Sequence, residues 1–166
     1  KNNSVAVTFS MADAISGIAS WKVQRSVATY SFGLCGSYGV WGDIGLANQS
    51  SPYADTTIAS GSCYRYRLLA TDRVGNTATI TTSKEVKVDK VAPSGSLTGF
   101  TEVSGEDYLY AIGSVLYYNP IAVVQASVDV DVTDVVSGIQ RVDYPALGPY
   151  GEAFASYSDP FGGQYT

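Results

Sequence analysis

Hydrophobic residues alternate with polar or small residues along several stretches of this chain of 166 residues. The clearest stretch covers residues 5–11, where every second position is apolar: Val5, Val7, Phe9 and Met11. A second covers residues 128–132, where valine alternates with aspartate. An apolar period of two is typical of a β-strand that buries one face and exposes the other. The pattern therefore predicts a half-buried strand at both places.

Further strands are predicted between these two. Residues 63–70 place large apolar side chains on one face, at Tyr64, Tyr66 and Leu68, and Arg65 and Arg67 on the other. Residues 18–27 and 53–58 also have strand character, whereas residues 33–45 are rich in glycine and are expected to be irregular. Residues 77–88 are rich in threonine and valine and close a hairpin after a turn at residues 74–76. An all-β, antiparallel chain is expected.

One short motif occurs twice. Asp13-Ala14-Ile15-Ser16-Gly17-Ile18 recurs as Asp134-Val135-Val136-Ser137-Gly138-Ile139, an offset of 121 residues, and each copy follows one of the two alternating strands. An aspartate side chain accepts hydrogen bonds from the backbone that follows it, and glycine adopts a positive φ without strain. The motif therefore predicts a turn between strands, and its recurrence predicts two units of one architecture.

The junction between the two units is predicted at residues 89–94. Pro93 keeps Ala92 extended and has no N–H to donate, so no strand is expected to run through this point. This composition is typical of a linker. We therefore expect one domain over residues 1–91 and another over residues 92–166. The first is expected to lack its first strand, and the second to be truncated at its C-terminal side.

Composition excludes several classes of function. The chain has no histidine, which removes the commonest general base and metal ligand, and its serines have no evident activating partner. We therefore expect no enzyme, no catalytic residues and no cofactor other than a structural ion. The net charge is -5 without a cluster of Lys and Arg, so nucleic acid is not an expected partner. No apolar run is long enough for membrane insertion.

The chain has two cysteines, Cys35 and Cys63. An even number without a Cys-x-x-Cys pair favours a disulfide over two separate buried thiols. Structural disulfides persist in oxidising compartments. A protein located outside the cell or on its surface is therefore predicted.

Four segments share a pattern with a known family: Asp13 to Ile18, Cys63 to Tyr66, Thr71 to Thr77 and Val88 to Pro93. Together they resemble bacterial immunoglobulin-like repeats of cell-surface and secreted proteins, of the adhesin or stalk type. The resemblance implies tandem immunoglobulin-like antiparallel β-sandwiches and a structural or adhesive module that forms a rod, a stalk or a surface filament. It implies neighbouring repeats or identical subunits as partners. A unit without its first strand has an open edge, which a strand from a neighbour fits.

The resemblance also implies candidate sites. Some adhesins of this kind bind calcium through aspartates at repeat junctions, which makes Asp13, Asp72 and Asp89 candidates for a structural calcium site. The alternative is that each of these aspartates only caps a turn. The two cysteines are closer in sequence than the paired cysteines of antibody domains. Their disulfide is therefore expected to join a central loop to the start of a late strand.

Aromatic residues support a different function. Trp41 and Tyr38 lie in the glycine-rich stretch and are candidates for binding a glycan or protein ligand. The chain would then be a glycan- or protein-binding accessory module of a secreted protein. The alternative is that these rings pack in the core or pair across strands, as aromatic residues of β-proteins commonly do.

Overall fold

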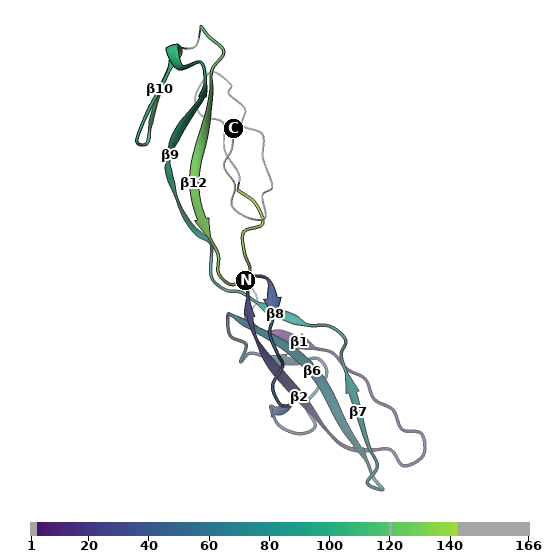
Figure 1. Ribbon diagram of the computed structural model, residues 1–166. Coiled ribbons are helices and arrows are strands. Elements are labelled where there is room, and N and C mark those ends of the chain that lie inside the picture. The colour runs from purple at the N-terminus through teal and green to yellow at the C-terminus, as the bar shows by residue number, and fades with distance from the viewer. Residues whose placement is uncertain (1–2, 120, 143–166) are drawn as a thin grey trace. The chain divides into compact units, whose positions relative to one another are not determined.

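The computed structural model describes residues 3–119 and 121–142. The chain divides into two compact units, Lys1–Val91 and Ala92–Thr166, which are treated separately below (Figure 1). The described part is built from antiparallel strands and contains one 3-10 turn, Glu106–Tyr108, and no α-helix. The expected all-β, antiparallel class is confirmed. Within the described residues, no helix has the length and apolar character needed to cross a membrane.

The first unit contains one large sheet and one small one. Its strands are β1 (Val5–Val7), β2 (Ile18–Ser31), β3 (Leu34–Cys35), β4 (Gly42–Ile44), β5 (Tyr53–Asp55), β6 (Ser62–Asp72), β7 (Thr77–Thr81) and β8 (Val86–Val88). In the large sheet β2 and β6 pair centrally, β3 and β4 pair with β2, and β7 and β8 pair with β6. The small sheet is the pair β1–β5.

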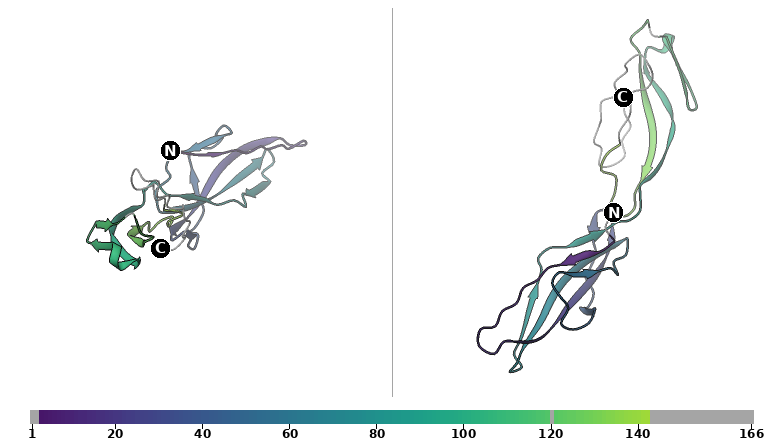
Figure 2. Two further views of the ribbon diagram at one scale, coloured as in Figure 1. Left: turned by 90° about the horizontal axis from the view of Figure 1, so that it is seen from above. Right: turned by 180° about the vertical axis from the view of Figure 1, so that it is seen from behind.

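The core of the first unit lies between these two sheets. The alternation in β6 buries Tyr64, Tyr66 and Leu68, which lie together with Val23 of β2. Residues from the small sheet pack against this cluster: Val5, Val7 and Tyr53. Figure 2 shows β1, in purple, lying over one face of the large sheet in the view from behind. The period of two in β6 thus places its apolar face on the layer that covers it.

Three predicted strands are shorter in the structure than in the sequence pattern. The strand predicted over residues 5–11 ends at Val7, although Phe9 and Met11 still pack against the core. The strand predicted over residues 53–58 ends at Asp55, and the one over residues 77–88 divides into β7 and β8. The glycine-rich segment, expected to be irregular, contributes the short strands β3 and β4. Strand ends depend on whether a partner strand is present, which the pattern along the chain does not specify.

The second unit is built on a long two-stranded ladder. Strands β9 (Ser94–Ser104) and β12 (Gln125–Thr133) pair along their length with two register shifts. A hairpin of β10 (Leu109–Ile112) and β11 (Val115–Tyr118) follows the 3-10 turn, and Tyr110 stacks on Tyr117 across it. Strand β12 contains the second alternating segment predicted from the sequence, and Val128 within it is buried.

Candidate functional site

The repeated motif forms the turn that its residues predict. Asp13 Oδ1 accepts hydrogen bonds from the backbone N–H groups of Ile15 at 2.9 Å, Ser16 at 2.9 Å and Gly17 at 3.2 Å. Gly17 has a φ of 71°, the left-handed conformation that the turn requires. The backbone donors, Ile15 and Ser16 foremost, lower the pKa of the Asp13 carboxyl. The carboxylate therefore organises the turn in its ionised form.

The second copy of the motif repeats these contacts in the second unit. Asp134 Oδ1 accepts hydrogen bonds from the N–H groups of Val136 and Ser137, each at 2.9 Å, and Gly138 has a φ of 78°. The pKa of Asp134 is lowered by the same kind of backbone donors, with Ser137 first. The repeat in the sequence is thus also a repeat in local structure.

A second aspartate turn lies beside the first. Asp72, at the end of β6, accepts hydrogen bonds from Val74 N at 3.0 Å and Asn76 N at 2.8 Å. Ser16 Oγ lies 2.9 Å from Asp72 Oδ2 and 3.2 Å from Asp13 Oδ2. Burial raises the pKa of Asp72, but donors from Asn76 and Ser16 outweigh this effect, and the pKa is lowered overall. Ser16 therefore links two turns that are distant in sequence.

The three aspartates proposed for calcium do not come together. Asp13 and Asp72 lie on either side of Ser16, but Asp89 accepts hydrogen bonds from Ser60 Oγ and Val91 N near the opposite end of β6. A strand of 11 residues is about 33 Å long at ~3.3 Å per residue. Within residues 3–119 and 121–142, no three His, Cys, Asp or Glu side chains are placed to hold one metal ion. Calcium binding at the individual turns stays a prediction.

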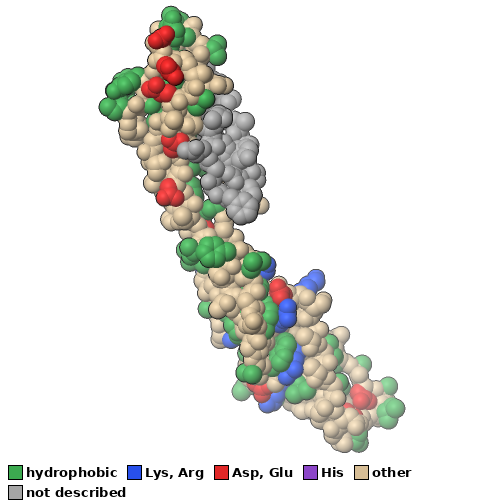
Figure 3. Space-filling model, in the orientation of Figure 1, with side chains coloured by type: hydrophobic (Ala, Val, Ile, Leu, Met, Phe, Trp, Pro, Cys, Tyr) green, Lys and Arg blue, Asp and Glu red, His purple; other side chains and the backbone are tan. Residues whose placement is uncertain are grey.

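The two aromatic residues proposed for ligand binding lie against arginines of β6. The guanidinium of Arg65 lies 4.0 Å from the ring centroid of Tyr38, and that of Arg67 lies 4.6 Å from Trp41. Figure 3 shows Lys and Arg side chains, in blue, next to hydrophobic ones on the first unit. Burial, followed by the charge of Glu85, raises the pKa of Tyr38. Each ring has one face covered by a cation, and ligand binding by these rings stays a prediction.

The structure contains the disulfide between Cys35 and Cys63, whose Cα atoms are 5.8 Å apart. It joins β3, which follows β2 closely, to the start of β6. Cys63 has no exposed surface. The bridge therefore connects the glycine-rich segment to the central strand of the sheet.

A buried ionic network was not anticipated from the sequence. Asp55 is fully buried, and its carboxylate accepts hydrogen bonds from Arg25 Nη1 at 2.7 Å, Tyr66 Oη at 2.9 Å and Thr57 N at 2.9 Å. Burial raises the pKa of Asp55, but the donors, with Thr57 first, lower it overall. The only sequence signal for this network is local: Asp55 lies in a short strand, and Thr57 follows it by two residues. The partners Arg25 and Tyr66 lie on other strands and carry no local signal.

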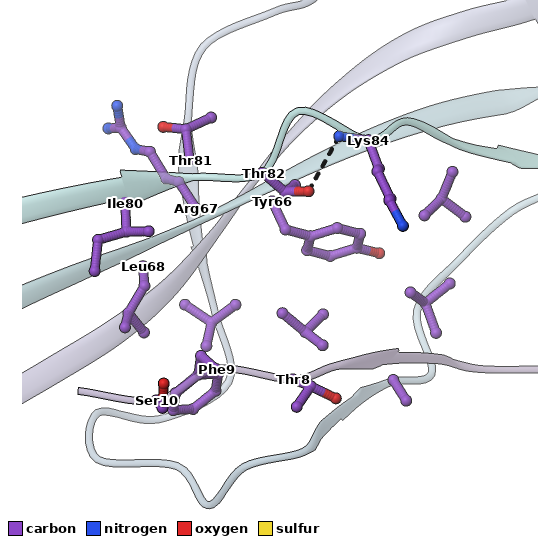
Figure 4. Close-up of a pocket in the computed structure, with 15 residues that line it drawn as sticks. Thr8, Phe9, Ser10, Tyr66, Arg67, Leu68, Ile80, Thr81, Thr82 and Lys84 are labelled. Atoms are coloured by element: carbon purple, nitrogen blue, oxygen red, sulfur yellow. Dashed lines mark hydrogen bonds between the residues drawn. The ribbon is translucent and has the colours of Figure 1, made fainter.

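A groove opens between the two sheets of the first unit, with a volume of about 500 Å³. One wall is the segment from Val5 to Ser10, and the other is formed by β7, the start of β8 and the residues between them. Figure 4 shows Thr8 and Phe9 on one side and Ile80, Thr82 and Lys84 on the other, with Leu68 and Tyr66 between them. Most of the lining is apolar: Val5, Ala6, Val7, Phe9, Val23, Leu68, Ile80 and Val86.

Both walls of this groove are strands paired on one side. β1 pairs with β5, and β7 pairs with β6; in the described part of the chain neither has a second partner. No residue of β5 lines the groove, so the groove faces the edge of β1 that lies away from β5. A strand edge left open in this way presents unpaired N–H and C=O groups. We take this groove as the candidate functional site.

Comparison with known proteins gives no assignment. No protein-family model, no curated protein and no solved structure shows a significant match to this chain.

Proposed function

We propose that this chain is a structural module of an extracellular repeat protein of the bacterial immunoglobulin-like kind, and that it contributes to a rod, stalk or surface filament. The observation that carries the proposal is the repeated turn. The same motif follows an alternating strand in each of two compact units, and its aspartate accepts the same backbone hydrogen bonds in both. Repetition of one supersecondary unit is typical of proteins whose function is extension.

The arrangement of strands in the first unit supports an immunoglobulin-like sandwich. Strands β4, β2, β6 and then β7 with β8 follow one another in one sheet, and the pair β1–β5 packs against its inner face. Two antiparallel sheets around a shared core are the basis of that fold. The Cys35–Cys63 disulfide supports a location outside the reducing cytosol.

Small-angle X-ray scattering of the full chain tests the rod. A compact globule of 166 residues has a radius of gyration of about 15 Å. Two units in line, each about as long as β6 with its turns, give a rod of about 80 Å and a radius of gyration of roughly 23 Å. A measured value near 15 Å would contradict the proposal. The variant Pro93→Gly is the matched control, because a more flexible junction broadens the distance distribution without altering either unit.

A glycan array separates the scaffold from the binding-module alternative. The scaffold proposal expects no glycan to be retained by the wild-type chain. Specific retention that is lost in Trp41→Ala, with the fold preserved by circular dichroism, would favour the accessory module instead.

A further inference from the structure

The segment that forms one wall of the groove has the pattern of a longer strand than it forms. Residues 5–11 alternate throughout, yet β1 ends at Val7. The repeat places residues 5–11 in correspondence with residues 126–132 of the second unit. All of those residues are paired with β9, from Ala126 opposite Glu102 to Val132 opposite Gly95. The first unit contains no counterpart of β9 in the part that the structure describes.

The groove lies where such a counterpart would pair. Phe9 donates its N–H to Ser51 Oγ, 2.9 Å away, and Ser51 lies two residues before Tyr53, where β5 starts. Successive residues of an extended chain direct their backbone groups to opposite edges. The neighbouring residues Thr8 and Ser10 therefore direct theirs away from β5, and both line the groove. An added strand would pair with this edge and bury the apolar lining.

Charge restricts what the groove accepts. Residues 1–91 contain nine Lys and Arg and six Asp and Glu, whereas residues 92–166 contain one and nine. Lys84 lines the groove and forms no ion pair within the described residues. A strand without Lys or Arg suits this environment. β9 has this composition, with Glu102 as its one charged residue.

We infer that the groove binds a peptide strand of the β9 type, supplied by a polypeptide segment outside residues 1–166, which adds antiparallel to β1. Its main chain pairs with residues 5–11, and its apolar side chains cover Phe9 and Ile80. This addition of a strand extends β1 to Met11 and gives the first unit the ladder that the second unit has in β9–β12. The inference concerns binding by the groove and does not depend on whether the two units form a rod.

The experiment uses the full chain and a synthetic peptide with the sequence of Ser94–Ser104, labelled for fluorescence anisotropy. Binding with one-to-one stoichiometry is expected. Ile80→Lys places a charge in the groove on a side chain that is 55% exposed, and weakens binding about tenfold or more, equal to ~1.4 kcal/mol. Val74→Lys is the matched control, since Val74 is 73% exposed and lies outside the groove lining. It leaves the affinity unchanged.

Hydrogen exchange locates the added strand. Bound peptide slows the exchange of amides in residues 5–11, and a peptide with Thr101→Pro, which lacks one N–H, binds more weakly. Three results would overturn the inference. One is absence of binding at millimolar peptide, and another is protection of residues 125–133 in place of 5–11. The third is self-association of the chain that Ile80→Lys abolishes while no peptide binds, because a second copy then occupies the groove.

Discussion

The disulfide allows the stability of the first unit to be predicted quantitatively. Cys35 and Cys63 are separated by 28 residues, and the bridge limits the conformations of that loop in the unfolded chain. In the chain-entropy treatment a loop of this size loses about 12 cal/mol/K, which stabilises the folded state by about 3.6 kcal/mol at 25 °C. For a unit of 91 residues this corresponds to a fall in Tm of roughly 15–25 °C when the bridge is absent.

The variant Cys35→Ser removes the bridge and keeps the sulfur of Cys63 in its buried site. Urea unfolding followed by tryptophan fluorescence suits this measurement, because the two tryptophans, Trp21 and Trp41, both belong to the first unit. The wild-type chain under reducing conditions is the control that involves no substitution. It should lose the same free energy of unfolding as the variant.

Two results would refute this reasoning. A free energy of unfolding that changes by less than about 1 kcal/mol would mean that the loop is already restricted in the unfolded chain. A loss in Cys35→Ser without an equal loss on reduction would mean that the serine, and not the missing bridge, causes the destabilisation.

Three further predictions concern the turns and the buried network. Asp55→Asn lowers the free energy of unfolding by about 3 kcal/mol at pH 7, because Arg25 loses its counter-ion. The folded pKa of Asp55 lies below the unfolded value of about 3.9, so its stabilising effect is present above that pH and is lost as the pH falls through the folded pKa. Urea unfolding of wild type and variant at several pH values checks this. Parallel curves of the free energy of unfolding against pH would contradict it. Gly17→Ala costs about 1–2 kcal/mol in a thermal or urea melt because φ is 71°, whereas Gly42→Ala, with open space around it, is close to neutral; equal effects would contradict the role of φ. If the aspartate turns bind calcium, a chelator lowers the Tm, and an unchanged melt removes that prediction.

The sequence alone predicts those parts of the candidate site that are local. The alternation over residues 5–11 marks the segment that forms one wall of the groove, and the pattern in β6 marks Tyr66 and Leu68 at its floor. The pairing of β7 and β8 with β6 follows from the hairpin predicted over residues 63–88. The position of this second wall across from β1 could not be predicted, because it requires the two sheets to pack against each other. The arginine partners of Tyr38 and Trp41 depend on the pairing of β2 with β6, because both rings lie between β3 and β4, which pair with β2.

What the sequence by itself determines about this protein follows from interactions between near neighbours. A period of two specifies strands, and aspartate with glycine at fixed spacing specifies the turns at Asp13 and Asp134. Tertiary structure decides where a strand ends and which charges are buried together. β1 ends at Val7 because a ladder needs a partner strand. Asp55 is buried as an ion because Arg25 reaches it from β2, earlier in the chain, and Tyr66 from β6, later in the chain. Hydrogen bonds and ion pairs of this kind connect distant parts of the chain, and a pattern along the sequence does not specify which parts will meet.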